Sequence, residues 1–177
     1  MVDTRTFIVS QRENERGGSR ENHLRGVYMM EENEFIIQQL SIFLDNRLAS
    51  LAELTRHLAN KGINLRALSI AETRDFGTTR IIVADPDACA NALREAGYHF
   101  IETDVIAVEV VDKPGGMADV LEIIASEHIS VEYAYAMVEK REGSAVVILR
   151  VDDTLKACMA LQARGITILR KGDVSLL

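Results

Sequence analysis

Hydrophobic positions from residue 35 onward follow two spacings, and each change of spacing marks a new element. Leucines recur at helical spacing over residues 51–61, which predicts a helix. Apolar, β-branched stretches on either side of it predict strands over residues 35–44 and 65–72. The elements expected next are a hairpin turn at Asp75-Phe76-Gly77, a strand over 79–84, a helix that begins after Asp85 and ends at Gly97, and a strand over 99–103.

The second half of the chain repeats this order. Its expected elements are strands over 105–111, 131–139, 144–151 and 166–169, helices over 117–127 and 153–164, and a turn at Glu142-Gly143. Landmarks lie 66 to 68 residues apart in the two halves, namely Asp45 with Asp112, Ile63 with Ile129, Gly77 with Gly143, and Gly97 with Gly165. Self-similarity at a near-constant period indicates an internal duplication of a βαββαβ unit.

A βαββαβ unit forms an antiparallel four-stranded sheet with both helices on one face, which is the ferredoxin-like arrangement. The sequence therefore predicts the α+β class, with two such domains in tandem over residues 35–104 and 105–177. Strands 105–111 and 144–151 carry apolar residues on both faces, so the face away from the helices needs cover. We expect the sheets to pair and the chain to form a homodimer. A charge in place of Val108 or Val147 should then weaken assembly or lower the stability of the protein.

The first 34 residues have a different composition. Residues 10–25 contain a single large apolar side chain, Leu24, and cannot bury enough surface to offset the entropy of ordering. We expect residues 1–34 to form a disordered arm. A second hypothesis is that the arm is a start-site artefact, because codons for Arg25-Gly26 can form a ribosome-binding site upstream of Met29. The alternative is an arm that folds on a partner.

Composition and charge exclude several classes of protein. The 177 residues carry a formal net charge of −7, which argues against nucleic acid and anionic membrane as partners, because both require a basic surface. No apolar run approaches the roughly 18 residues of a membrane span, and the chain does not start with the apolar segment of a secretory signal. We expect a cytoplasmic protein.

Catalytic and metal-binding patterns are also missing. Cys89 and Cys158 lie in separate helical patterns without the paired spacing of a zinc or redox motif, and the four histidines show no metal-ligand spacing. No glycine-rich phosphate loop is found, and Asp75-Phe76-Gly77 stands without the other kinase motifs. We therefore expect no metal, no cofactor, no catalytic residues and no enzyme activity.

The turn before the helix of the second half has the chemistry of a small-anion site. Pro114 fixes one φ angle, while Gly115 and Gly116 permit positive φ and leave the backbone bare. The helix that starts near Met117 directs free N–H groups and its positive dipole end at the turn. An amino acid fits there, with its carboxylate at the helix and its ammonium group on Asp112 or a main-chain carbonyl. The alternative is that the turn has only a structural role.

Two segments of the second half resemble the signature of the ACT domain, a small amino-acid-binding regulatory module: residues 112–118, DKPGGMA, and residues 128–131, HISV. Residues 46–51 and 62–65 resemble it in the first half. The resemblance implies two tandem ACT domains over residues 35–169. It places ligands between the strand-to-helix loop of one copy and the start of the second strand of a paired copy.

The ligand-binding residues that the resemblance implies come from both copies. They are Asp45, Asn46, Arg47, Leu48 and Ala49 in the first loop, Asp112, Lys113, Pro114, Gly115, Gly116 and Met117 in the second loop, and Ile63, Asn64, Ile129 and Ser130 at the second strands. The first loop has Leu48-Ala49 where a Pro-Gly would fall, so we expect the ligand to depend more on the second loop.

Two functions follow from this resemblance. In the first, the chain is a non-catalytic regulatory protein that senses a free amino acid at ACT–ACT interfaces and controls a partner enzyme or regulator. In the second, it is a constitutive regulatory subunit of an amino-acid biosynthetic enzyme, similar to the small subunit of acetolactate synthase. Both require a partner protein.

Overall fold

The computed structural model describes residues 33–72, 76–141 and 143–176. The predicted arm and its start-site hypothesis lie outside these residues, apart from Asn33 and Glu34 in a short 3-10 helix, η1 (Asn33–Phe35). The turn residues Asp75 and Glu142 lie outside them as well. Phe35–Leu177 forms one compact unit.

The described part of this unit has the predicted α+β fold. Its strands are β1 (Ile37–Asp45), β2 (Leu65–Glu72), β3 (Phe76–Val83), β4 (His99–Val111), β5 (Val131–Arg141) and β6 (Ser144–Val151). Its helices are α2 (Ser50–Asn60), α3 (Pro86–Glu95), α4 (Gly116–Ser126), α5 (Thr154–Ala163) and α6 (Lys171–Leu176). β2 and β6 have the predicted bounds, because polar turn or loop residues flank both apolar stretches.

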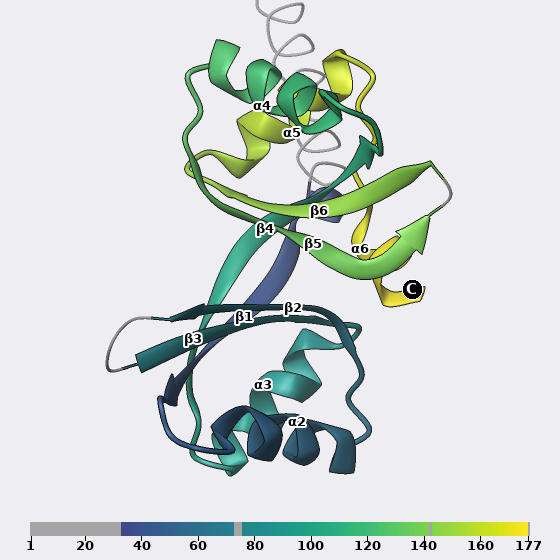
Figure 1. Ribbon diagram of the computed structural model, residues 1–177. Helices are drawn as coiled ribbons and strands as arrows, with labels where there is room; N and C mark the ends of the chain where they lie inside the picture. The colour runs from purple at the N-terminus through teal and green to yellow at the C-terminus, as the bar shows by residue number, and fades with distance from the viewer. Residues whose placement is uncertain (1–32, 73–75, 142, 177) are drawn as a thin grey trace, which may run out of the picture. The chain divides into compact units, whose positions relative to one another are not determined.

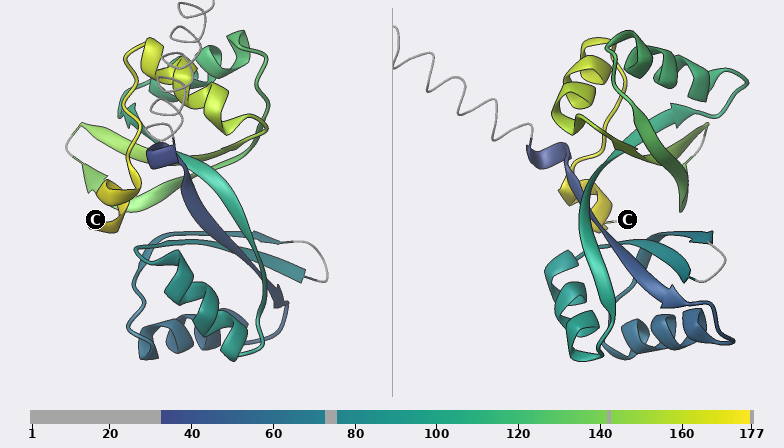
Figure 2. Two further views of the ribbon diagram at one scale, coloured as in Figure 1. Left: turned by 180° about the vertical axis from the view of Figure 1, so that it is seen from behind. Right: turned by 90° about the vertical axis from the view of Figure 1, so that its left-hand side faces the viewer.

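The strands form one antiparallel sheet in the order β2-β3-β1-β4-β6-β5. β4 changes partner part-way: it pairs with β1 as far as Val105 and with β6 from Ile106 onward. The sequence predicted two strands here, over 99–103 and 105–111. The structure instead has one continuous strand that ends the first copy and begins the second, and Figure 2 shows it in teal running without a break between them.

Each copy places its two helices on one face of its strands (Figure 1). In the first copy, buried residues of β1 and β3 pack against α2 and α3, with Leu40, Leu54 and Leu93 fully buried. In the second copy, β4 and β6 pack in the same way against α4 and α5, around Ile106 and Ile124. Alternate strand residues face the helices, so the predicted ferredoxin-like layering is confirmed.

The faces away from the helices are covered within the chain. Ala67 and Ile82 of the first copy share a buried cluster with Ala107, Val146 and Ile148 of the second copy. The apolar second face that the sequence predicted therefore finds cover in the other copy. Buried polar groups adjoin this cluster: the Gln39 amide donates to the hydroxyl oxygens of Ser41 and Tyr133, both at 2.8 Å, and accepts from Tyr135 at 2.9 Å.

Val108 and Val147 do not lie on this covered face. Val108 is fully buried in the helix-side core of the second copy, and Val147 packs against the same core. The prediction chose the wrong face because Val146, Val147 and Ile148 are consecutive apolar residues, so alternation alone does not show which of them face the helices. A charge at Val108 would disrupt the second copy's own core.

The C-terminal region differs most from the prediction. Instead of a strand over 166–169, the chain makes an isolated bridge between Ile168 and Val108. The short helix α6 follows and was not predicted. Its Val174 is buried in the cluster between the copies, and its Ser175 carbonyl accepts a hydrogen bond from Arg66 at 3.0 Å. A six-residue helix is too short for hydrophobic periodicity to reveal it.

Candidate functional site

The two strand-to-helix turns have the same backbone conformation. The residue before each helix is left-handed, with φ 71° at Ala49 before α2 and φ 94° at Gly115 before α4. Matching hydrogen bonds close the turns: Arg47 N to Asp45 O and Ser50 N to Arg47 O in the first copy, Lys113 N to Val111 O and Gly116 N to Lys113 O in the second. The copies thus align at an offset of 66, one residue away from the Asp45–Asp112 match made on sequence.

Ala49 was expected to make the first turn different, and it does not. A left-handed conformation costs an L-residue roughly 1–2 kcal/mol, yet Ala49 adopts it. The neighbouring Leu48 is 95 % exposed, so its side chain does not pack over the turn. The first turn therefore has the backbone conformation of the glycine-containing turn, and the stronger dependence of the ligand on the second loop stays a prediction.

The helices that follow these turns lack side-chain caps. No side chain accepts a hydrogen bond at the start of α2 or α4, whereas Asp85 caps α3 and Asp153 caps α5, at 2.9 and 3.0 Å. The first N–H groups of a helix have no partner inside the helix, and they carry its positive dipole end. In each copy, then, the helix after the predicted ligand loop has no side-chain acceptor at its start, whereas an aspartate accepts from one N–H group of the other long helix.

A cavity of about 400 Å³ opens at the first turn. It is lined by Asp45, Asn46, Arg47 and Ala49 of the predicted loop and by Ser50, Leu51 and Ala52 of α2. Ile70 of β2 and Thr79 of β3 form another wall, and sequence reasoning missed them because they come from strands distant along the chain. Ile70 is a large apolar residue that is 48 % exposed in mid-strand, a feature that only the structure shows.

The charges at the first turn are largely paired with each other. The Arg47 guanidinium binds Glu53 of α2 through both carboxylate oxygens, and one of these contacts is at 3.0 Å. Hydrogen bonding from Arg47 holds the pKa of Glu53 below its ordinary value. Arg47 is thus committed to α2, and the helix N–H groups are the donors left for a carboxylate.

At the second turn, Asp112, Lys113 and Pro114 are exposed. Gly115 has open space around it, whereas a Cβ on Gly116 would lie 2.1 Å from the Val111 carbonyl oxygen. The two glycines therefore have different reasons to be glycine. Gly115 allows positive φ, and Gly116 allows a close approach of two backbone segments.

The four residues at the second strands do not join the turns within one chain. They follow the C-terminal ends of α2 and α4, roughly 16 Å of helix away. Ile63 and Ile129 pack into the two helix-side cores, while Asn64 and Ser130 are exposed, and the Ser130 N–H donates to Asp152 at 2.9 Å. A ligand site that joined them to a turn would require a second chain.

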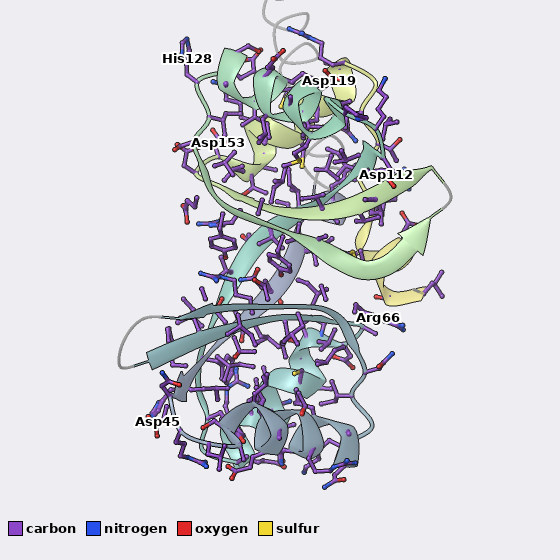
Figure 3. All side chains as sticks on the ribbon, viewed as in Figure 1. Asp45, Arg66, Asp112, Asp119, His128 and Asp153 are labelled. Carbon is purple, nitrogen blue, oxygen red and sulfur yellow. The ribbon has the colours of Figure 1, made fainter. Side chains whose placement is uncertain are left out.

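The opposite ends of α2 and α4 also match, at Gly62 (φ 74°) and His128 (φ 58°). Figure 3 labels Asp112 and His128, which lie at the two ends of α4. His128 is thus the residue that ends the helix in a left-handed conformation, away from the turn.

The remaining candidate chemistry lies elsewhere. Cys89 and Cys158 are buried in helices, and burial raises the pKa of the Cys89 thiol to about 11. Within the described ranges, no group of three His, Cys, Asp or Glu side chains gathers as a metal site would need. None of the described helices is long and apolar enough to cross a membrane.

Comparison with known proteins identifies the family of this fold. The family model of the ACT domain pair matches residues 35–175. The chain belongs to this family. ACT domains are regulatory ligand-binding modules, and the two copies described above are the pair. No curated protein sequence matches the chain.

Solved structures of other proteins are similar to this ACT domain pair. A protein from Bacteroides thetaiotaomicron is 36 % identical, with a TM-score of 0.76 over 81 % of this chain and 98 % of that one. The ligand-free regulatory subunit of aspartate kinase from Thermus thermophilus is 20 % identical, with a TM-score of 0.55 over 73 % and 90 %. The second likeness shows the shared fold alone.

Proposed function

We propose that this ACT domain pair is a non-catalytic regulatory protein that binds a free amino acid at its strand-to-helix turns and controls a partner enzyme or regulator. The observation that supports this most is the first turn, where an uncapped helix start borders a cavity of about 400 Å³. An amino-acid carboxylate would accept from the free N–H groups of α2, and the Asp45 carboxylate would hold the ammonium group.

The equivalent turn of the second copy supports the same role. Its helix α4 is also uncapped, and Asp112, Lys113 and Pro114 lie exposed beside it. The residues at the second strands, among them Asn64 and Ser130, reach a turn only from another chain. We therefore propose a homodimer in which the start of β2 or β5 of one chain closes the turn of the other.

Thermal denaturation with each of the twenty amino acids tests this function. At a ligand concentration 100-fold above the dissociation constant, the native state gains about 2.7 kcal/mol, which gives a clear rise in Tm. We expect one amino acid, or one chemical group of them, to raise the Tm. If all twenty leave the Tm unchanged at millimolar concentration, the chain is not an amino-acid sensor.

Three variants locate the site. Gly115→Val and Ala49→Val put a branched side chain at the left-handed residue of each turn. Gly172→Val is the control, because Gly172 lies in α6, has open space around it and does not line the cavity at the first turn. We expect calorimetric titration to show lost binding in a turn variant and retained binding in Gly172→Val.

The second candidate function is a constitutive regulatory subunit of an amino-acid biosynthetic enzyme. The shared fold with a protein named as the regulatory subunit of an aspartate kinase favours it. Purification of the tagged chain from its native cells distinguishes the two functions. A stable stoichiometric complex that forms without any amino acid indicates a subunit, whereas binding of an amino acid to the isolated chain indicates a sensor.

A further inference from the structure

A larger cavity, of about 590 Å³, lies against the strand faces that the helices do not cover. Its walls come from both copies: Ser41 and Arg80 belong to β1 and β3, whereas Tyr133 and Arg150 belong to β5 and β6. This cavity shares no lining residue with the cavity at the first turn. An occupant would touch both ACT domains at once.

Two arginines in this cavity have unfilled hydrogen-bonding capacity. Among the described residues, the buried side-chain nitrogens without a hydrogen-bond partner are the Nε atoms of Arg66, Arg80 and Arg150. The last two line the same cavity. A buried donor without a partner costs about 1–3 kcal/mol, so two such donors on arginines that line one cavity point to a group that fills them.

Arg80 is the better placed of the two. Its guanidinium carbon lies 4.1 Å from the centroid of the Tyr133 ring, so the group stacks on the aromatic face. Stacking holds the plane of the fork in place and leaves its edge for planar, bidentate recognition. Arg150 is partly occupied, because one terminal nitrogen donates to the Asp104 carbonyl oxygen at 2.9 Å.

Glu102, Asp104 and Glu132 also line the cavity, and no ion pair among the described residues joins one of them to Arg80. Glu102 is paired with Arg94, at 3.3 Å, and Glu132 lies 3.5 Å from the Arg150 Nε, which is an ion pair without a hydrogen bond. An anion that reached Arg80 and the Nε of Arg150 would complete the hydrogen bonding of both arginines. Guanidinium forks match carboxylate and phosphate groups equally in geometry.

We infer that this cavity is a second ligand site, separate from the turns, which binds a small metabolite through a carboxylate or phosphate group held by Arg80 and Arg150. Because β1 and β3 form one wall and β5 and β6 the other, the ligand stabilises the packing of the two copies. The site is independent of the amino acid proposed for the turns.

Nuclear magnetic resonance of arginine Nε–H groups tests this inference on the full chain. Succinate and inorganic phosphate, neither of which has an ammonium group, are the two probes. We expect one of them to shift the Nε–H signals of Arg80 and Arg150 in a saturable manner. The signal of Arg66, whose Nε also lacks a partner but lies outside the cavity lining, should not move.

Matched variants complete the test. Arg80→Met removes the fork and keeps the aliphatic stem, and should weaken binding about tenfold or more, because a charged hydrogen bond is lost. Arg80→Lys keeps the charge without the fork, and its affinity should fall between those of Arg80→Met and the unmodified chain. Arg56→Met makes the same change in charge on exposed α2 and should bind as the unmodified chain does.

Two results would overturn the inference. The first is that neither probe shifts the Arg80 and Arg150 signals at millimolar concentration, a measurement that needs no variant and so does not depend on Arg80→Met folding. The second is equal affinity in Arg80→Met and the unmodified chain. Gly115→Val should keep this binding, so a failure of the amino-acid hypothesis and a failure of this one give different results.

Discussion

Alanine at two adjacent glycines before α4 should have very different consequences. At Gly116, the new Cβ would lie 2.1 Å from the carbonyl oxygen of Val111 and 3.2 Å from its carbonyl carbon. A Cβ atom makes ordinary van der Waals contact at 3.4 Å or more, so the backbone of β4 or α4 must move by more than about 1 Å. Overpacking costs roughly 1–3 kcal/mol when side chains can adjust, and here the obstacle is backbone. We expect a loss of about 3 kcal/mol or more.

At Gly115, the same substitution meets open space, and only the backbone angle opposes it. A left-handed alanine costs roughly 1–2 kcal/mol, and the stiffer unfolded chain returns about 0.4–1 kcal/mol. The expected net loss is about 0.5–1 kcal/mol. Ala49 already occupies the equivalent position of the first copy at φ 71°, which shows that the turn tolerates a methyl group.

Urea denaturation followed by circular dichroism measures both variants. A shift of the midpoint at an unchanged slope reports stability. Ala49→Gly makes the reverse change at the matching residue and should gain about 0.5–1 kcal/mol. If Gly116→Ala loses no more stability than Gly115→Ala, the close approach to Val111 does not exist and the description of this turn is wrong. This outcome also bears on binding experiments, because a Gly116 variant alters the turn itself.

Four further predictions concern single residues. Ile148→Ala removes a fully buried side chain between the copies and should lower the unfolding free energy by about 2–5 kcal/mol; a loss below 1 kcal/mol in urea would contradict that packing. Tyr135→Phe leaves the Gln39 amide oxygen without its donor and should lower the unfolding free energy by about 1–3 kcal/mol in the same assay; no measurable loss would contradict this hydrogen bond. Because burial raises the pKa of Cys89 from 9.0 to about 11, its contribution to stability is complete below pH 9 and is lost as the pH rises toward 11; iodoacetamide should modify it slowly at pH 8, and rapid labelling of the native chain would contradict this. His128→Gly relieves a left-handed residue and should raise the unfolding free energy by about 0.5–1 kcal/mol, which moves the urea midpoint upward; a lower midpoint would show that the imidazole has a stabilising contact.

Much of the fold could be predicted from the sequence because the signals are local. The spacing of Leu51, Leu54 and Leu58 defines one face of α2, and the turn residues on either side of the apolar run define the length of β6. The duplication strengthened the prediction of helices and strands, since the same order of elements was predicted from two independent halves of the chain. The loop residues of the candidate site were found in the same way, from glycine and proline chemistry beside a helix start.

The rest depended on information that a local pattern does not carry. Asp104 is an exposed acid between two apolar stretches, so one long strand appeared as two. The hydrogen bonds of the turn impose the left-handed conformation on Ala49, and because alanine does not favour this conformation, the sequence gives no sign of it. Ile70, Thr79, Arg80 and Tyr133 line cavities from strands far apart in sequence, and only the strand order brings them together.

The shared strand β4 limits how this protein can change over evolution. Side chains alternate along a strand, so inserting one residue inverts every side chain on one side of the insertion. In most tandem proteins such an insertion is absorbed by a linker. Here any insertion between His99 and Val111 would turn Ile106 and Val108 out of one core, or misplace the strand's pairing with β1 in the other. The two ACT domains therefore cannot be separated or recombined as independent modules, and insertions should be tolerated in the loops long before they are tolerated in β4.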